Sequence, residues 1–200
     1  SFLRYNSNAN LDEIIPVEVV NKKSTIIIDT DEEPGRGKID RLSNLKPAFQ
    51  KEGTITAANA SSLNDGAAAL VVMSQSQADK LEVNPICKII KHVSIAHDPL
   101  YFTTAPSKAI DKVLNESNLS LSDIDLFEIN EAFSNVVISA INYHSIPYEK
   151  VNVNGGAVSL GHPIGASGAR ILVTLINALK QKNKKLGLAS PIVFSSGSVP

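Results

Sequence analysis

The sequence has few residues of several types, and each scarcity excludes a class of protein. Among its 200 residues there is one cysteine, Cys87, so neither an internal disulfide nor a Cys-x-x-Cys metal site is expected. The formal net charge of −1 gives no electrostatic reason to expect nucleic acid or an anionic membrane as a partner. No apolar run is long enough to cross a bilayer, and the first residues lack the apolar core of a signal peptide. We therefore predict no nucleic acid and no membrane among the partners.

Two phosphate-binding patterns are also missing. The Gly-x-Gly-x-x-Gly fingerprint of dinucleotide-binding loops does not occur. Gly156 and Gly161 have the spacing that opens a Walker loop, but His162 and Pro163 stand where that loop needs Lys and Ser or Thr. The other histidines have no metal-ligand spacing and are interpreted as structural or exposed: His92, His97 and His144. Cys87, in an apolar alternation, is interpreted as a small buried hydrophobic residue.

The remaining composition is that of a globular protein, with 43% apolar and 20% charged residues. Short apolar, β-branched runs predict strands, and apolar residues at helical spacing predict helices. The predicted strands are 14–20, 24–29, 66–73, 86–93, 124–129, 151–154 and 191–195. Helices are predicted behind a Ser74 cap, from about Ala105, and over 131–145 and 166–181. This alternation predicts a layered α/β fold with a boundary near residues 82–86.

One stretch, NGGAVSLGHPIGASGAR at 154–170, holds five glycines, a proline and a single histidine. Glycines at that density indicate a sharp turn or a close approach of the backbone to another group. His162 precedes a predicted helix, whose amino end carries partial positive charge and disfavours an imidazolium ion. We therefore expect a neutral His162 near pH 7 that could act as a base. A turn histidine that only hydrogen-bonds its own loop fits the local sequence equally well.

Two further segments are candidates for a catalytic or binding role. Asn130, in Asn-Glu-Ala-Phe, stands at a predicted strand-to-helix junction. Its amide could simply cap the helix, which is the more economical interpretation, or it could hold a water or donate to an oxyanion. The small residues of GTITAANAS, 53–61, would let a ligand lie against the backbone, although a tight packed loop explains them equally well.

Taken together, four segments resemble the thiolase family. GTITAANASSLNDGAAALVVMS (53–74), NEAF (130–133), GGAVSLGHPIGASGAR (155–170) and KLGLAS (185–190) are similar to its motifs and occur in its order. The resemblance runs from about residue 14 to 190, covers only the second half of a thiolase, and implies a layered α-β-α-β-α fold. It also implies two units. Residues 1–85 would be the end of the amino-terminal domain with part of the coenzyme A loop region, and residues 86–200 the carboxyl-terminal domain.

The resemblance also implies a reaction. AANAS (57–61) and DPLYFTTAPSKAI (98–110) are similar to eukaryotic-type acetoacetyl-CoA thiolases, which condense two acetyl-CoA molecules to acetoacetyl-CoA and CoA, or catalyse the reverse thiolysis. In such an enzyme His162 would activate the nucleophilic cysteine and help polarise the thioester oxygen, and Asn130 would hold a water in the oxyanion hole. The residues implied to contact the substrate are Arg36, Arg41, Ala58, Ser61, Phe102, Ala132 and Phe133.

The partners of the complete protein are implied in the same way. They are acetyl-CoA and acetoacetyl-CoA, with the coenzyme A thioester as substrate and no separate cofactor, and further copies in a homodimer or homotetramer. Relatives that bind potassium use backbone carbonyls matching Ala57, Ala58, Ala60 and Val158, but their tyrosine partner has no counterpart here. No metal site is therefore predicted, and a potassium ion on these carbonyls is kept only as an alternative. The compartment, cytoplasm or mitochondrion, is left open.

Two departures from the family limit the reaction. The nucleophilic cysteine of thiolases belongs to the half that the resemblance does not cover, and Cys87 falls in a different motif. After GLAS the family reads x-Cys-x-Gly-Gly-Gly, whereas here Ile192 takes the place of the second catalytic cysteine in a divergent tail, 191–200. We therefore expect this chain to be inactive alone, because loss of a nucleophile removes most of the rate. The alternative is a non-catalytic remnant that binds coenzyme A or pairs with a thiolase subunit.

Overall fold

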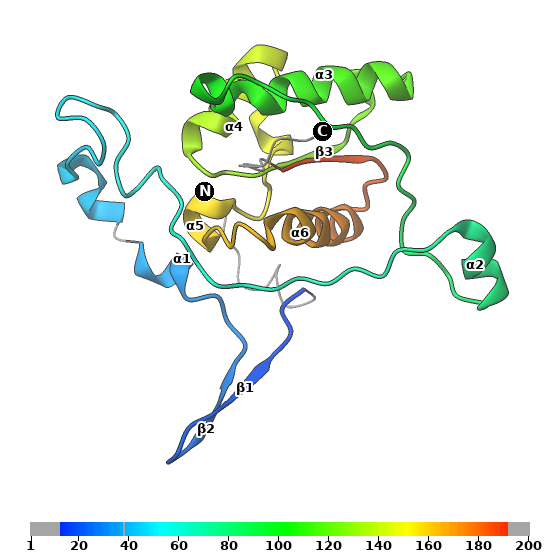
Figure 1. Cartoon of the computed structure of the whole chain (residues 1–200), viewed down its shortest axis with the longest axis horizontal. Helices are drawn as coiled ribbons and strands as arrows, with labels where there is room; N and C mark the ends of the chain where they lie inside the picture. Colours follow the sequence, from blue (N-terminus) through cyan, green and yellow to red (C-terminus); the bar gives the residue numbers. More distant parts are fainter. Residues whose placement is uncertain (1–12, 38, 192–200) are drawn as a thin grey trace.

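The computed structural model describes residues 13–37 and 39–191, which form a layered body with an extended amino-terminal part (Figure 1). The helices are α1 (Glu33–Arg36), α2 (Gln75–Lys80), α3 (Ala105–Ser117), α4 (Ser134–His144), α5 (Ala157–Leu160) and α6 (Ser167–Gln181). Short 3-10 helices are η2 (Ile39–Asn44), η3 (Pro99–Thr104), η4 (Leu121–Asp123) and η5 (Tyr148–Lys150). The strands are β1 (Val17–Val20), β2 (Thr25–Ile28), β3 (Leu126–Ile129) and β4 (Gly187–Ser190).

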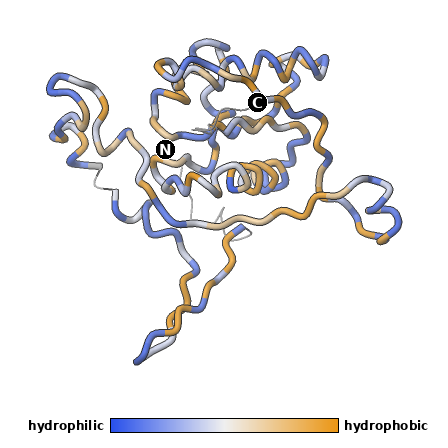
Figure 2. The backbone as a smooth tube through the Cα atoms, viewed as in Figure 1, coloured by the Kyte–Doolittle hydropathy of each residue, from blue (hydrophilic) through white to orange (hydrophobic). Residues whose placement is uncertain are grey.

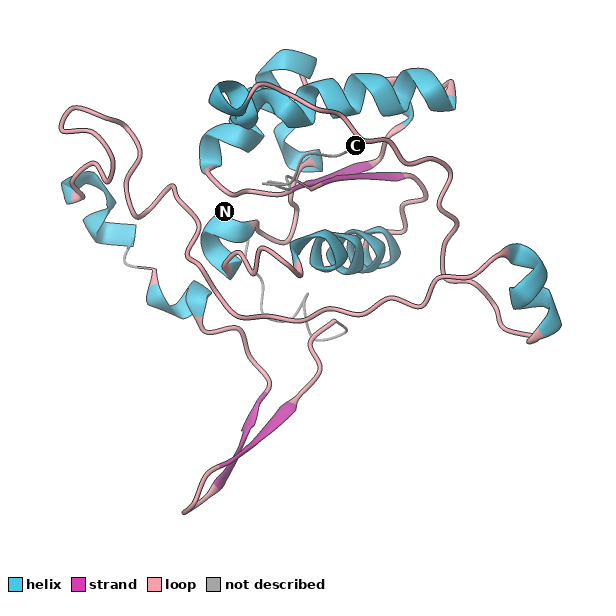
Figure 3. Ribbon diagram, viewed as in Figure 1, coloured by secondary structure: helices cyan, strands magenta, loops and turns pink. Residues whose placement is uncertain are grey.

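The centre of the body is a parallel pair of strands between two helix layers. β3 pairs with β4 in a register that runs from Leu126 opposite Gly187 to Ile129 opposite Ser190. α3 and α4 cover one face of this pair and α6 covers the other (Figures 1 and 3). Because parallel strands need a crossover connection, the chain passes from β3 through α4, α5 and α6 before it returns as β4.

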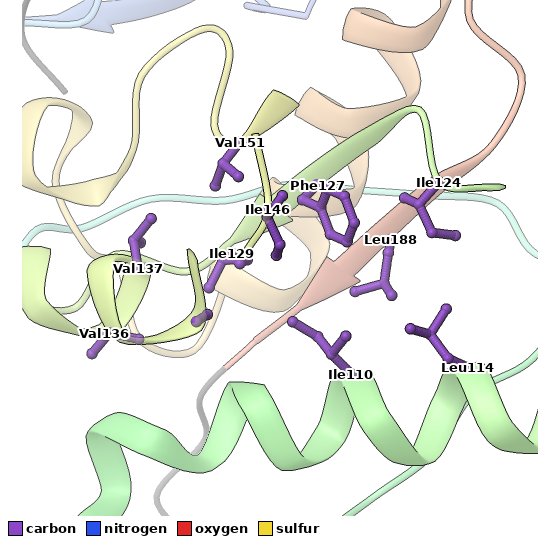
Figure 4. Close-up of a cluster of buried hydrophobic side chains, with 11 residues drawn as sticks. Ile110, Leu114, Ile124, Phe127, Ile129, Val136, Val137, Ile146, Val151 and Leu188 are labelled. Atoms are coloured by element: carbon purple, nitrogen blue, oxygen red, sulfur yellow. The ribbon is translucent and has the colours of Figure 1, made fainter. Parts of the chain in front are cut away.

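The side chains of β3 alternate between the two helix layers, as the pleat of a strand requires. Phe127 and Ile129 point into the apolar cluster formed with α3 and α4, where Ile110 is fully buried (Figure 4). Leu126 packs on the opposite face against Leu175 of α6. Full burial of side chains of this size stabilises the folded state by about 1.5–3 kcal/mol each, so the core lies around β3.

The four predicted helices are confirmed as α2, α3, α4 and α6, and local chemistry sets their limits. α2 begins behind Ser74, whose Oγ accepts a hydrogen bond from the Gln77 N–H at 3.2 Å. α3 begins at Ala105-Pro106, because proline fits the first turn of a helix. It ends at Asn118, whose left-handed φ of 54° stops the helix.

Three of the predicted strands are confirmed and two are not. The segments 14–20, 24–29 and 124–129 contain β1, β2 and β3. The predictions for 66–73 and 86–93 are wrong, because in the described part of the chain both segments are largely exposed and belong to no sheet. Figure 2 shows that the run before α2 is nevertheless hydrophobic. A strand needs a neighbour for its N–H and C=O groups, and local apolar character does not supply one.

The segment 151–154, predicted to be a strand, is held beside β3 mainly by a side chain and not by a ladder of backbone hydrogen bonds. A single bridge joins Val151 to Phe127, and no ladder continues from it. Instead the Asn152 amide pairs with the backbone of Ile129: its Oδ1 accepts from the N–H and its Nδ2 donates to the carbonyl, both at 2.8 Å. Asn152 takes a left-handed φ of 46°, which asparagine tolerates better than most residues.

The last predicted strand is not tested, whereas the predicted surroundings of Cys87 need correction. β4 ends at Ser190, before the strand predicted at 191–195, and residues 192–200 lie outside the described part of the chain. Cys87, predicted to be buried, is exposed. Since the segment 86–93 has no strand beside it, its thiol has no apolar layer to enter. Within the described ranges, no helix has the length and apolar character needed to cross a membrane.

β1 and β2 form an antiparallel hairpin that projects from the body (Figures 1 and 3). The Asn21 N–H donates to the Ser24 carbonyl at 2.8 Å and closes the turn. Every residue of both strands is exposed, including Ile26 and Ile27. A hairpin of two strands without a packed face is marginally stable, so its stability does not come from burial within the described residues.

Candidate active site

Three segments that are far apart in the sequence meet beyond the carboxyl end of β3. Ser61 donates twice to the Ala132 carbonyl, from its N–H at 3.0 Å and from its Oγ at 2.8 Å. The carbonyl of Ser62, the residue after Ser61, accepts a hydrogen bond from the His162 N–H at 2.9 Å. The small-residue segment around Ser61 therefore lies hydrogen-bonded between the Asn-Glu-Ala-Phe and Gly-His-Pro segments, which brings three of the four quoted motifs together.

The glycine-rich stretch makes the close backbone approaches that its composition predicts, at two positions. Gly161 takes a φ of 91°, and a side chain there would collide with the Asn64 side chain. At Gly156 an added Cβ would lie 2.9 Å from Nδ2 of Asn152, closer than real contacts allow. Gly165 has open space where its side chain would be, so that glycine is not required for packing.

His162 is 7% exposed, and each of its ring nitrogens has a partner from a different element. Nδ1 lies 2.7 Å from Oγ of Ser167, the first residue of α6. Nε2 lies 3.3 Å from Nδ2 of Asn130, which is 32 residues away in the sequence. The interpretation of His162 as a turn residue bonded only to its own loop is therefore wrong.

The surroundings of His162 favour the neutral ring. Burial lowers its pKa below the usual 6.5, and the positive charge of Arg170 lowers the pKa further. The sequence also predicted a neutral His162, but it attributed this state to the amino end of the following helix, which is not the main cause. Desolvation acts most strongly, and α6 begins only at Ser167. A neutral imidazole can accept a proton near pH 7.

Asn130 does not cap a helix, so the more economical interpretation of this residue is wrong. The N-cap of α4 is Phe133, and no side chain makes the capping bond. Asn130 is fully buried, and its N–H donates to the Ser190 carbonyl at 3.0 Å. Its Oδ1 is buried and has no hydrogen-bond partner among the described residues. An acceptor in this state costs about 1–3 kcal/mol, so the position suits a bound donor such as water.

Phe133 and Phe102, both predicted to contact substrate, are neighbours in the structure. Their ring centroids lie 6.1 Å apart in an edge-to-face arrangement. Phe49 contacts Phe133 at the same centroid distance, although 71% of Phe49 is exposed. Sequence reasoning missed Phe49, whose only signal was an isolated aromatic residue in a polar segment. The three rings together form an apolar cluster around Phe133, the residue that follows Ala132.

Ala58 lies in a turn that polar side chains hold in shape. Its N–H donates to Thr56 Oγ1 at 3.2 Å, and the Thr56 N–H donates to Asn59 Oδ1 at 2.8 Å. Val158 lies in α5, where its N–H donates to Glu131 Oε2 at 3.1 Å. The carbonyls considered for potassium therefore come from two separate elements. The potassium alternative and the binding role of Ala58 both stay predictions.

The two arginines predicted to contact phosphate lie on exposed elements. Arg36, in α1, pairs with Glu32 and Glu33, both at 2.6 Å. Glu33 also accepts a hydrogen bond from Ser62 Oγ at 3.1 Å, which places α1 beside the small-residue segment. Arg41 is exposed in η2. Exposed ion pairs contribute little stability, so Arg36 could exchange its partners for a phosphate, and both roles stay predictions.

A buried ion pair that sequence reasoning missed lies on the far side of β3. Glu128 is 1% exposed, and its Oε1 accepts from Arg170 of α6 at 3.2 Å. Desolvation raises the pKa of Glu128 to about 7, although the Arg170 charge opposes this. The sequence did contain a signal for this pair, the alternation of IDLFEI at 124–129. In a strand, this alternation directs Glu128 to the face opposite Phe127 and Ile129, toward the other helix layer.

The sequence matches two models of one known family. Residues 83–198 match the family model described as "Thiolase, C-terminal domain", and residues 5–76 match "Thiolase, N-terminal domain". The chain belongs to the thiolase family. The resemblance of the four motifs is thereby confirmed, whereas the division into units at residue 85 stays a prediction.

Two thiolase relatives illustrate the likeness and its extent. The "Probable acetyl-CoA acetyltransferase" of Dictyostelium discoideum is 48% identical over 189 residues, which are 94% of this chain and 45% of that protein. The "Acetyl-CoA acetyltransferase" of Yarrowia lipolytica is 50% identical over 170 residues, 85% of this chain and 43% of that protein. The chain thus spans less than half the length of these relatives.

Solved thiolase structures have the same fold over the matched part. The Bacillus anthracis acetyl-CoA acetyltransferase superposes with a TM-score of 0.87 at 42% identity, covering 91% of this chain and 46% of that one. Human mitochondrial 3-ketoacyl-CoA thiolase gives 0.85 at 33% identity, covering 96% of this chain and 50% of that one. The predicted layered, thiolase-like fold with half of a thiolase present is therefore confirmed.

Proposed function

We propose that this chain supplies the histidine and oxyanion side of a thiolase-type acyltransferase. The complete enzyme would condense two acetyl-CoA molecules to acetoacetyl-CoA and CoA, or catalyse the reverse thiolysis. The observation that carries the proposal is the buried pair of His162 Nε2 and Asn130 Nδ2, 3.3 Å apart, beside an Asn130 Oδ1 that has no partner among the described residues. Relatives named acetyl-CoA acetyltransferase support the choice of acyl group.

The chain's own residues fit the first half of such a reaction. A cysteine thiol from outside the described residues gives its proton to Nε2 of His162, and its sulfur attacks the carbonyl carbon of acetyl-CoA. The resulting imidazolium N–H, together with a water held by Asn130, donates to the oxyanion. The oxyanion then collapses, the bond to the CoA sulfur breaks, and the leaving thiolate takes the proton from His162. The acetyl group remains on the cysteine.

The second half-reaction needs a base for the methyl proton of a second acetyl-CoA. The family resemblance assigns that role to a second cysteine, and Ile192 occupies its place in this sequence. Ile has no group that accepts a proton, so we propose that this chain supports acetyl transfer but not carbon–carbon bond formation.

Substrate binding is proposed at the cluster of phenylalanine rings around Phe133, which lies in the same short segment as Asn130. Phe102 and Phe133 would contact the pantetheine arm, and Ser61 and Ala132 would lie beside it. Arg36 would reach the phosphates with Arg41, because a guanidinium matches phosphate geometry. Acetyl-CoA and acetoacetyl-CoA are the proposed small-molecule partners. A homodimer or homotetramer of the complete enzyme also stays a prediction.

Acetyl transfer can be tested by supplying the missing cysteine in a second polypeptide. The chain is mixed with the cysteine-bearing amino-terminal segment of the Bacillus anthracis enzyme, and release of free CoA from acetyl-CoA is followed. We expect release with the unaltered chain and with His92→Gln, whose target is exposed, and at least about 10²-fold slower release with His162→Gln. Equal release with both variants would exclude His162 as the base.

A second candidate function, pairing with a thiolase subunit without catalysis, is favoured by exposed apolar residues in the segment before α3. Leu63, Val71 and Ile86 are each more than 80% exposed, at 82%, 88% and 84%. Apolar exposure of this kind marks surfaces that another chain covers. Size-exclusion chromatography of the same mixture separates the two functions. A stable complex that releases no CoA supports the pairing function alone, and calorimetric titration with CoA then tests whether the remnant binds the coenzyme.

A further inference from the structure

We propose that Ser167 is a positioning residue, whose hydroxyl holds His162 in the tautomer with the proton on Nδ1 and the lone pair on Nε2. The tautomer follows from contacts within the chain. Its use in catalysis rests on the proposed function, in which Nε2 must be unprotonated to accept a thiol proton.

The direction of each hydrogen bond follows from what the atoms can donate. Ser167 Oγ lies 3.0 Å from the Pro163 carbonyl, which is only an acceptor, and we assign the single hydroxyl hydrogen to this bond. Toward the ring, 2.7 Å away, Oγ can then only accept, and Nδ1 of His162 must carry a hydrogen. A neutral imidazole carries one such hydrogen, so Nε2 has the lone pair and accepts from Nδ2 of Asn130.

The backbone holds Ser167 in the position that this arrangement needs. Ser167 is 3% exposed, and its N–H donates to the same Pro163 carbonyl at 2.9 Å. That carbonyl therefore receives the N–H and the hydroxyl of Ser167, together with the Ala166 N–H at 2.8 Å. His162, directly before Pro163, is fixed by its own N–H bond to Ser62 at 2.9 Å. The imidazole and the hydroxyl thus belong to one short, fully hydrogen-bonded turn at the start of α6.

The other tautomer of His162, with the proton on Nε2, also has a hydrogen-bond partner available in the structure. Asn130 Oδ1 has no partner among the described residues, and an amide can exchange its oxygen and nitrogen by rotation about one bond. With the proton on Nε2, a rotated Asn130 could accept it through Oδ1. In that state Nε2 would be a donor and could not take a proton from a thiol. The Ser167 hydroxyl favours the other state, because only the Nδ1–H form uses its acceptor.

Long-range ¹H–¹⁵N NMR of the histidine-labelled chain at pH 7 tests this inference, since it separates protonated from unprotonated ring nitrogens. The His162 signals are assigned by their loss in His162→Gln. We expect a proton on Nδ1 in the unaltered chain and in Ser167→Thr, which keeps the hydroxyl. In Ser167→Ala we expect the proton to move to Nε2 in most molecules.

Ser117→Ala is the matched control. Ser117 Oγ also donates to a carbonyl four residues earlier, that of Val113 at 2.6 Å, but it belongs to α3. This variant should leave the His162 signals unchanged, which separates a tautomer effect from a general loss of helix stability. A Ser167→Ala spectrum that equals the Ser117→Ala spectrum would overturn the assignment to Ser167.

The unaltered chain alone already decides the first half of the inference. A proton on Nε2 in that spectrum overturns it, whether or not any variant folds. The NMR measurement uses no acetyl-CoA and no second polypeptide. Absence of acetyl transfer from a chain with a proton on Nδ1 would therefore refute the proposed function and leave the tautomer assignment intact.

Discussion

Replacement of Glu128 by Gln is expected to stabilise the chain at alkaline pH and to have little effect at acidic pH. The carboxyl group is 1% exposed, and desolvation raises its pKa from 4.5 to about 7 although Arg170 lies 3.2 Å away. Glu13 and Glu131 act in the same direction, since their negative charges also raise the pKa of Glu128. The folded state therefore favours a neutral carboxyl group at this position.

The size of the effect follows from proton linkage. The folded chain binds more protons at Glu128 than the unfolded chain between pH 4.5 and about 7. The stability that this provides is fully present below pH 4.5 and is lost as the pH rises through about 7. At 1.36 kcal/mol per pKa unit, the whole change is about 3 kcal/mol. Gln keeps the size and the hydrogen-bonding oxygen but has no proton to lose, so the variant does not show this loss.

Urea unfolding followed by circular dichroism at about pH 4 and about pH 8.5 measures the effect as a difference in the free energy of unfolding. We expect the variant to match the unaltered chain at acidic pH and to exceed it by about 3 kcal/mol at alkaline pH. Glu149→Gln, at an exposed position, is the control and should show no such change. A Glu128→Gln chain that becomes less stable than the unaltered chain as pH rises would refute the reasoning, because Arg170 would then outweigh desolvation.

Three further predictions concern the core and the site. Phe127→Ala, at a position 1% exposed, should lower the free energy of unfolding by about 3–5 kcal/mol in the same urea assay. Gly161→Ala, at a φ of 91° and against Asn64, should cost about 1–3 kcal/mol, whereas Gly165→Ala in open space should cost nothing; equal costs would contradict the packing argument. The His162 ring should titrate below 6.5 by NMR, because burial and Arg170 both lower its pKa, and a higher value would contradict the site geometry.

Local sequence patterns predicted those parts of the fold that short-range chemistry determines. α2 could be predicted from its Ser74 cap, α6 from its apolar spacing, and β3 from its β-branched run. The segments 66–73 and 86–93 have equally apolar runs but form no strand in the described chain. Pairing depends on a second segment in register, and nothing within either run specifies one.

In the candidate site, too, local sequence identified the residues but not the contacts between them. His162, Asn130, Ser61, Ala132 and Phe133 were found because each stands in a motif. Their mutual arrangement depends on contacts between residues far apart in the sequence, such as Ser61 and Ala132, which are 71 positions apart. Asn130 looked like a cap because the local rule cannot show a histidine 32 residues later. The pair of Glu128 and Arg170 was missed for the same reason, since its members lie 42 residues apart.

The central claim is that the buried His162 and Asn130 pair performs thiolase-type acetyl transfer, and mass spectrometry of the acetylated cysteine tests it most directly. The chain is incubated with acetyl-CoA and the cysteine-bearing segment of the Bacillus anthracis enzyme, and the mass of that segment is then measured. We expect the addition of one acetyl group with the unaltered chain and with His92→Gln, and none with His162→Gln. Acetylation that is equal with all three chains, or absent from all three although the two polypeptides form a complex, would contradict the claim.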